Sequence, residues 1–322
     1  MSVVSSAARE IRPGEPGAKP FPHPLVLKIA ATRPAFMTVT LLGCWLGFAA
    51  AHRAGVAIDG WLVAVATFFA LVAHAGVNVI NDYFDAHNGS DAANTGRVFP
   101  FTGGSRFIQN GVMSLEETGK YGRALFLVVI PAGLWLCTQV NLGLIAFGVA
   151  GLLIGWAYSA PPLQLMSRGL GELSVVLGWL VIVTGADYVL RGSYAWAPWL
   201  VGMPFALLVG NILFINEFPD READALAGKA TLVVRWGPEA AKWVYLLVML
   251  LAHAWVVMAI EKGVLPQLAG LSLLTLIPGM RAARDLLRHA RQPAELANAI
   301  KLSIATANLH GVLLIIGLWF GR

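Results

Sequence analysis

Charge is what this sequence has least of. Only 13% of its 322 residues are charged, 57% are hydrophobic, and the mean hydropathy is +0.68. Soluble domains carry about 25% charged residues, so this composition excludes an ordinary soluble protein. Cysteine is almost absent as well. Cys44 and Cys137 both fall within apolar runs, and we expect neither a disulfide framework nor a cysteine-based metal site.

Apolar runs long enough to cross a bilayer, which takes about 20 residues, recur along the chain. We predict nine spanning helices, near 35–52, 61–84, 122–138, 142–160, 171–190, 196–218, 239–260, 264–280 and 301–320. They leave no room for a separate soluble catalytic domain. The sequence therefore predicts an all-α integral membrane protein, with one domain at 25–322. Residues 1–24 are polar, rich in proline and glycine and unlike a signal peptide, and predict a flexible cytosolic tail.

Lysine and arginine are distributed unevenly between the two ends of these runs. If the N-terminus is cytosolic, all but four of the 23 basic residues fall on the cytosolic side; the exceptions are Arg53, Arg191, Lys262 and Arg322. This bias follows the positive-inside rule and predicts an N-in, C-out chain. The net charge of +5 then reflects topology, and we expect no nucleic-acid partner.

The second apolar run ends in NVINDYFDAHNGSD (78–91), with amides and carboxylates where lipid contact is expected. Residues spaced three or four apart share one face of a helix. By this spacing one face near the cytosolic end carries His74, Asn78, Asn81, Asp82 and Asp85, and Asp91 follows within a turn or two.

The sixth run ends in a similar way, in GNILFINEFPDREADALAGKATL (210–232). Asn216, Asp220 and Asp224 recur every four residues and share one face at the same end of the membrane. Asn-x-x-x-Asp thus occurs at 81–85 and at 216–220, each time with a further acid downstream. The two copies predict two halves of one site.

Energy supports this prediction. A carboxylate near the middle of a membrane helix costs about 2.5–3.5 kcal/mol, so four facing lipid would cost on the order of 10 kcal/mol, comparable to the whole stability of many proteins. These acids must face a wet cavity, a cation or the headgroup layer. The alternative, that they only mark the cytosolic boundary, suits Asp91 or Glu222 taken singly better than the repeated pattern.

Clustered carboxylate and amide oxygens are hard ligands, which suit Mg²⁺ bridged to a substrate phosphate. Basic residues follow both clusters: Arg97 and Arg106 after the first, Arg221 and Lys229 after the second. Acids beside bases predict a site for magnesium and diphosphate. The glycines of FTGGSRFIQNG (101–111) would let backbone amides approach phosphate oxygens.

The stretches NDYFDAHNGSD (81–91) and NEFPDREADALAGKATLVVRWG (216–237) resemble the two aspartate-rich motifs of the UbiA superfamily of intramembrane prenyltransferases. The resemblance is closest to the menaquinone branch, the 1,4-dihydroxy-2-naphthoate polyprenyltransferases. Arg33-Pro34 and WAYSAPPLQLMSRGLGEL (156–173) are similar to further family segments, and the count of nine spans agrees.

The resemblance implies a barrel of nine helices around a central cavity, with a cytosolic cap formed by the motif-bearing loops. It implies two Mg²⁺ ions, one held by Asn81, Asp85 and Asp91 with Asp82 in reach, the other by Asn216, Asp220 and Asp224. Of these, Asp85, Asp220 and Asp224 are the expected catalytic residues. The residues expected to bind substrate are Asn78, Arg106, Tyr158, Arg168 and Lys229.

The implied reaction transfers a polyprenyl group from polyprenyl diphosphate to an aromatic acceptor, here 1,4-dihydroxy-2-naphthoate. It belongs to menaquinone biosynthesis at a bacterial-type inner membrane, with the active site facing the cytosol and the isoprenoid tail running into the lipid bilayer. Apolar helices would shield the allyl cation from water, and Trp156, Tyr158 and Phe214 are candidates to stabilise it. One departure is Pro219, where many relatives carry arginine.

Two alternatives stay open. A UbiA-type enzyme could use another acceptor, such as 4-hydroxybenzoate, homogentisate, haem or chlorophyllide. From a different class, an ion-coupled membrane transporter also carries buried acids, but usually near the bilayer midplane on interrupted helices. Here both clusters lie at one end. For Asp187, near the opposite surface, we predict a hydrogen-bonded structural role.

Overall fold

The computed structural model describes residues 11–17 and 19–321, and every regular element in that part of the chain is a helix, as predicted. The long helices are α2 (Thr38–Arg53), α3 (Gly60–Asn88), α5 (Leu115–Gln139), α6 (Leu144–Ser159), α7 (Gly171–Arg191), α8 (Ala197–Leu226), α9 (Leu232–Glu261), α10 (Leu276–His289) and α11 (Ala297–Phe320). The short ones are α1 (Pro24–Ala31), α4 (Ser90–Ala93) and the 3₁₀ segments η1 (Pro34–Met37), η2 (Leu165–Arg168), η3 (Gln267–Thr275) and η4 (Pro293–Leu296). Residues 1–10 of the predicted tail lie outside the described residues.

Seven of the described helices are long and apolar enough to cross a membrane: α2 with η1, α3, α5, α7, α8, α9, and α11 with η4. Of the nine predicted spans, seven therefore coincide with helices that could cross a membrane. Helix α6 is apolar but has only 16 residues. The run at 264–280 is divided between η3, of 9 residues, and the adjoining α10, of 14 residues, and it is not among the candidate spans; α10 carries Arg281, Arg284 and Arg288.

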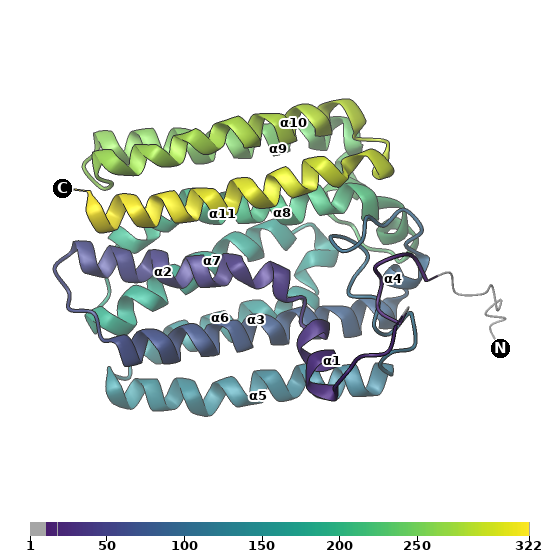
Figure 1. Ribbon diagram of the computed structural model, residues 1–322, viewed down its shortest axis with the longest axis horizontal. Helices are drawn as coiled ribbons and strands as arrows, with labels where there is room; N and C mark the ends of the chain where they lie inside the picture. Colours follow the sequence, from purple (N-terminus) through teal and green to yellow (C-terminus); the bar gives the residue numbers. More distant parts are fainter. Residues whose placement is uncertain (1–10, 18, 322) are drawn as a thin grey trace.

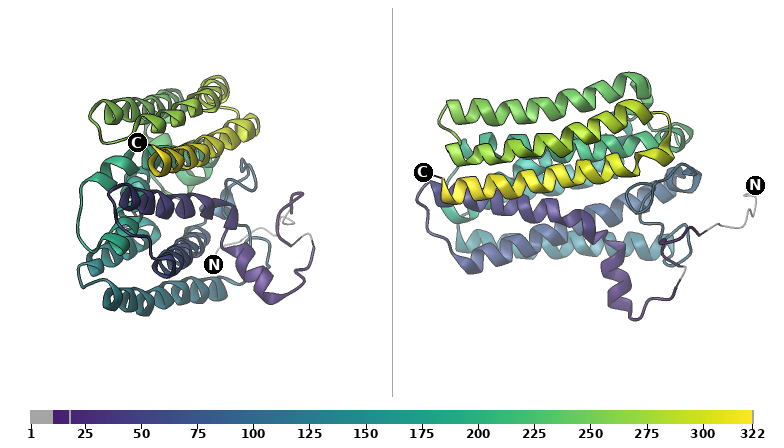
Figure 2. Two further views of the ribbon diagram at one scale, coloured as in Figure 1. Left: turned by 60° about the vertical axis from the view of Figure 1, so that its left-hand side comes forward. Right: turned by 45° about the horizontal axis from the view of Figure 1, so that its top comes forward.

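The long helices lie side by side, and consecutive ones run in opposite directions (Figure 1). The ordered N-terminal segment, α1 and α4 lie at one end of the bundle and the C-terminus at the other, as two further views also show (Figure 2). Among the seven candidate spans α8 is the most buried and α5 the least. The second acidic face, on α8, is therefore central in the protein.

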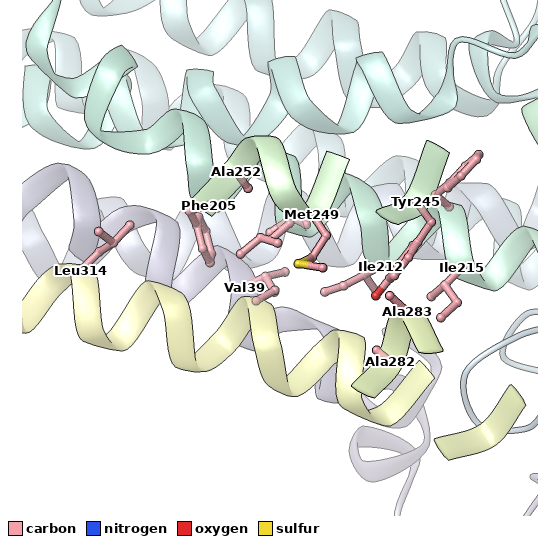
Figure 3. Close-up of a cluster of buried hydrophobic side chains, with 14 of the residues drawn as sticks. Val39, Phe205, Ile212, Ile215, Tyr245, Met249, Ala252, Ala282, Ala283 and Leu314 are labelled. Carbon is pink, nitrogen blue, oxygen red and sulfur yellow. The ribbon is translucent and has the colours of Figure 1, made fainter. Parts of the chain in front are cut away.

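One side of the bundle is a packed apolar core. Helices α8 to α11 pack with α2 around side chains such as Phe205, Ile212, Met249 and Leu314 (Figure 3). On its other side α8 faces a cavity that it shares with α2, α3, α6 and α7. Helix α8 thus lies between the packed apolar core and the cavity.

Asp187 lies toward the end of the bundle opposite α4. Asp187 on α7 is buried and accepts two hydrogen bonds of 2.7 Å from the guanidinium of Arg191, one turn away. The structural role predicted for Asp187 is confirmed, because its charge is paired within its own helix.

Helices α2 and α7 approach closely at Gly47. A Cβ at this position would lie 2.1 Å from the carbonyl oxygen of Val183 and 2.8 Å from Cβ of Ala186. Backbone cannot yield cheaply at such a contact, and overpacking typically costs about 1–3 kcal/mol. We expect Gly47→Ala to lower the melting temperature of the detergent-solubilised protein by several degrees.

A matched control is Gly133→Ala in α5, where nothing lies within 4 Å of the added Cβ. It should leave the melting temperature unchanged or raise it slightly, since alanine favours helix. Equal melting temperatures for the two variants would contradict the close α2–α7 contact.

Candidate active site

A cavity of about 320 Å³ lies among α2, α3, α6, α7 and α8, and extends to the end of the bundle that carries α4. Its lining divides into two chemically different parts. The acids and amides of the two motifs, with the loop after α4, form a polar end. Small and apolar side chains from the membrane-spanning parts of the helices form an apolar arm.

The first motif occupies the last turns of α3. Asn78, Asn81 and Asp85 line the cavity, and Asn81 Nδ2 donates to Asp85 Oδ2 at 3.0 Å. Gly89, with φ of 87°, ends the helix, and the chain turns into α4, which adds Asp91 to the cavity wall. Glycine suits this left-handed turn because it has no Cβ.

Asp82, which was expected in reach of a metal, points elsewhere. Its carboxylate pairs with the guanidinium of Arg33 and accepts a hydrogen bond of 3.3 Å from the backbone N–H of Ser105, and it does not line the cavity. Asp82 lies three residues before Asp85 and shares its side of α3, so the pairing with Arg33 directs its side chain away from the cavity. Asp82 therefore holds Arg33 and the loop after α4 in place.

The second motif occupies the end of α8, which continues as a helix through Pro219. Asn216, Asp220 and Asp224 all line the cavity, as their spacing of four predicts. Asn216 Oδ1 is buried and has no hydrogen-bond donor. A buried amide oxygen without a partner is costly and is suited to a cation or a donor on a ligand.

The two motifs meet at Lys229. Its ammonium lies 2.6 Å from Asp85 Oδ1 and 3.3 Å from Asp224 Oδ1, so it joins residues that are 139 positions apart in the sequence. Burial disfavours the charged ammonium, but Asp85 and Asp224 more than offset this and hold the pKa of Lys229 above its ordinary value. The predicted substrate-binding lysine therefore lies between the two motifs.

The loop at 94–113, between α4 and α5, closes the polar end. Asn94 Nδ2 donates to Asp220 Oδ1 at 2.5 Å, and the backbone N–H of Gly103 donates to Asp220 Oδ2 at 3.4 Å. Gly104 packs on Asp91: with φ of +73°, it would bring an added Cβ to 2.4 Å from Asp91 Oδ2. The glycines selected from the sequence thus bring backbone directly against the acids.

The polar end is rich in acids and poor in bases, which favours a cation. Burial, with a smaller contribution from Asp85, raises the pKa of Asp91 to about 6. Within the described residues no three acidic, histidine or cysteine side chains already form a complete metal-ligand set. Mg²⁺ commonly takes only one or two carboxylates and completes its shell with water and phosphate, so the donors here fit it. Five carboxylates and two cations line the cavity: Asp85, Asp91, Glu217, Asp220 and Asp224, against Arg33 and Lys229.

Four residues selected from the sequence lie away from the cavity. Arg106 is buried and donates to the backbone carbonyl of Asp91 rather than lining the cavity. Arg168 is exposed and donates to the carbonyl of Pro162 at 2.8 Å. Trp156 and Phe214 are also absent from the lining, whereas Tyr158 belongs to it. Loop arginines could not be placed from sequence, because their directions depend on contacts distant along the chain.

Among the cavity residues that were missed as site candidates are two charged side chains and an amide. Arg33 was noted in the sequence only as part of Arg33-Pro34. Asn94 does not belong to either of the two Asn-x-x-x-Asp series. Glu217 lies one position away from the series Asn216, Asp220 and Asp224 on α8. Glu217 accepts a hydrogen bond of 3.2 Å from the backbone N–H of Val233. Only Arg33 carried a usable signal, its place directly before the first span.

The apolar arm runs between the helices from the polar end. Its lining consists of Gly151, Ile154 and Gly155 of α6, Ala70, Ala73 and Val77 of α3, Gly178, Trp179 and Ile182 of α7, and Val209 and Ile212 of α8. The small residues leave room for a chain, and the apolar lining excludes water. With a cation bound among the acids, the site can therefore hold a ligand with an anionic head and a hydrocarbon tail.

Comparisons with known proteins show the family to which the chain is similar. A family model described as "UbiA prenyltransferase family" matches residues 39–305. A Bacillus subtilis protein named 1,4-dihydroxy-2-naphthoate octaprenyltransferase is 25% identical over 288 residues, which is 89% of this chain and 90% of the relative. A Synechocystis protein named 2-carboxy-1,4-naphthoquinone phytyltransferase is 27% identical over 309 residues, covering 92% and 94%.

Among solved structures, a UbiA homolog from Archaeoglobus fulgidus, described as bound to DMAPP and Mg²⁺, has a similar fold. The TM-score is 0.57 at 15% identity, and the match covers 90% of this chain and 99% of that one. At this identity the similarity concerns the helical fold.

Proposed function

The chain belongs to the UbiA prenyltransferase family and is a membrane prenyltransferase, and from this we propose that it transfers a polyprenyl group from an allylic diphosphate to 1,4-dihydroxy-2-naphthoate. One observation carries the proposal: a single cavity joins an end rich in acids and amides to an apolar arm among membrane helices. A polyprenyl diphosphate has the same division into an anionic head and a hydrocarbon tail.

The polar end would bind the diphosphate together with Mg²⁺. The Archaeoglobus relative bound to DMAPP and Mg²⁺ supports the use of this metal. Asn81, Asp85 and Asp91 would hold one ion, and Asn216, Asp220 and Asp224 a second. Bound Mg²⁺ supplies charge neutralisation for the departing diphosphate.

Residues of the chain itself support ionisation of the donor. Lys229 and Arg33 line the polar end and place positive charge where the diphosphate would gain negative charge. The arm excludes water, which would otherwise capture the allyl cation as an alcohol. Tyr158 and Trp179 line the cavity and offer aromatic faces to the cation.

The acceptor assignment rests on the two sequence relatives, whose names refer to a naphthoate and a naphthoquinone. In the proposed reaction the carbon–oxygen bond to diphosphate breaks and the diphosphate keeps the electron pair. A ring carbon of the acceptor supplies the pair for the new carbon–carbon bond. Loss of the acceptor's carboxylate as CO₂ returns a pair to the ring, so the step needs no oxidant.

We also propose the complete membrane arrangement. It has nine crossings in a barrel, N-in and C-out, with the α4 end of the bundle in the cytosol of a bacterial-type inner membrane. The loops and helix ends on that side carry most of the Lys and Arg of the described chain, which supports this orientation. Both substrates would then reach the polar end from the cytosolic side.

The test is an assay in membranes that contain the protein, with 1,4-dihydroxy-2-naphthoate and polyprenyl diphosphates of several lengths, in Mg²⁺ or in EDTA. We expect prenylated naphthoquinol to be extractable with Mg²⁺, and its formation to stop in EDTA because the diphosphate then loses its neutralising charge. Parallel reactions contain 4-hydroxybenzoate or homogentisate as acceptor. Product with one of these and none with the naphthoate would refute the acceptor assignment while keeping the donor chemistry.

A further inference from the structure

Residues 11–17, assigned from sequence to the flexible tail, lie against the outer side of the loop at 94–113. The guanidinium of Arg12 donates to the carbonyls of Thr95 at 2.8 Å and Arg97 at 3.1 Å. A Cβ on Gly17 would lie 3.3 Å from Val112 Cγ2, so the segment also touches the far end of this loop. This segment lies at the end of the bundle that carries α4 (Figure 1).

A buried ion pair fastens this segment. Arg97 Nε donates to Glu15 Oε1 at 2.6 Å, and the side chains of Arg97 and Glu15 are only 7% and 0% exposed. The other carboxylate oxygen of Glu15 accepts from Asn110 Nδ2 and from the backbone N–H of Arg12, both at 3.2 Å. The hydrogen bonds outweigh the effect of burial and hold the pKa of Glu15 below its ordinary value. Removing one member of such a pair leaves an uncompensated buried charge, unlike at an exposed surface pair.

Two routes lead from Arg97 to the acidic site. In the first, Arg97 Nη1 donates to the carbonyl of Asn94 at 2.9 Å, and Asn94 Nδ2 donates to Asp220 at 2.5 Å. In the second, Gly103 packs on the stem of Arg97, where an added Cβ would lie 2.7 Å from Arg97 Cβ. The N–H of Gly103 is the second donor to Asp220. Glu15 is therefore linked through one arginine to Asn94 and Gly103, two of the donors to the Asp220 carboxylate.

We infer that Glu15 is a positioning residue: through Arg97 it holds Asn94 and Gly103 against Asp220, and so sets the geometry in which the polar end takes up magnesium and diphosphate. The inference rests on the proposed function for the identity of that ligand. The N-terminal segment at 11–17 then stabilises the loop at 94–113 in the conformation that contacts Asp220. Arg97 does not line the cavity, so it acts on the site only through Asn94 and Gly103.

The test compares Glu15→Gln, Arg12→Ala and a control in the purified full-length protein. Amide hydrogen exchange is followed by mass spectrometry, and Mg²⁺ is titrated at fixed geranyl diphosphate until residues 94–104 are protected. Glu15→Gln keeps the shape of the side chain but removes its charge, and a hydrogen bond to a charged group is worth about a tenfold change or more. We expect 94–104 to exchange about tenfold faster, and the Mg²⁺ concentration for half-maximal protection to rise by about tenfold. Arg12→Ala, which leaves no buried charge, should produce a smaller change in the same direction.

The control is Glu116→Gln on α5, whose side chain is 76% exposed in a surface pair with Lys120. It should match the wild type in both measurements. Wild-type exchange and Mg²⁺ dependence in folded Glu15→Gln would overturn the inference. So would faster exchange in every peptide of the protein, or faster loop exchange with unchanged Mg²⁺ dependence, because Glu15 would then be only an anchor. Neither measurement requires the enzyme to turn over. A failure of the proposed reaction can therefore be distinguished from a failure of this inference.

Discussion

Asp220→Asn should reduce prenyl transfer about a thousandfold in a protein that still folds, because a carboxylate that organises charge at the leaving group is worth that much in comparable sites. Asp220 lines the polar end and accepts from Asn94 and from Gly103 N–H. Asparagine keeps the side-chain volume but not the negative charge required for a cation. The measurement is the initial rate at saturating acceptor, with Mg²⁺ varied to separate weaker metal binding from slower chemistry.

The matched control is Glu222→Gln, two residues away on the same helix but exposed. It changes the same net charge at the same end of the membrane and should keep nearly the full rate. Adding Asp85→Asn to Asp220→Asn should cost little more, because residues that act as one unit are not additive. Equal losses in Glu222→Gln and Asp220→Asn would mean that only surface charge at this end matters, and the site would be wrong.

Gly104→Ala should lower kcat/KM about a hundredfold, since small displacements of catalytic groups have effects of this size. An added Cβ would lie 2.4 Å from Asp91 Oδ2 and 3.0 Å from Asp91 Oδ1, so the loop or the carboxylate must move. Asp91 is one of the proposed ligands, and its displacement opens the polar end. The measurement is kcat/KM for the prenyl diphosphate at fixed Mg²⁺.

The same loop supplies the control. Gly111 has the same φ of +73° but nothing within 4 Å of an added Cβ. Both substitutions carry a similar backbone strain, so their difference isolates the collision with Asp91. Gly111→Ala should retain activity within a few fold of the wild type. If both variants lose activity equally, backbone strain in the loop is the cause and the contact with Asp91 has no special role.

Several features follow from the sequence by itself, because they depend on residues close together along the chain. Low charge and long apolar runs determine that the protein is helical and lies in a membrane. The spacing of Asn216, Asp220 and Asp224 determines that they share one face of α8, because that face is set by the 3.6-residue period. The same period places Asn81 and Asp85 together on α3.

Other features were decided only by the tertiary structure. Asp82 lies on the same helix end as Asp85, yet pairing with Arg33 takes it out of the cavity. Arg97 follows the first motif closely and points to Glu15 instead of the site. The apolar run at 264–280 becomes η3 and the first turn of α10, and this stretch is not among the candidate spans.

The physical reason is the range of the interactions. Helix periodicity is a local property of backbone geometry, so a pattern of a few residues reveals it. The direction of a loop arginine or a carboxylate is decided by which partner satisfies its charge, and the partners here are distant along the chain: 82 residues for Arg97 and Glu15, 126 for Asn94 and Asp220. Spacing along the chain determined the two acidic faces, and charge pairing across the folded structure decided which of their acids line the cavity.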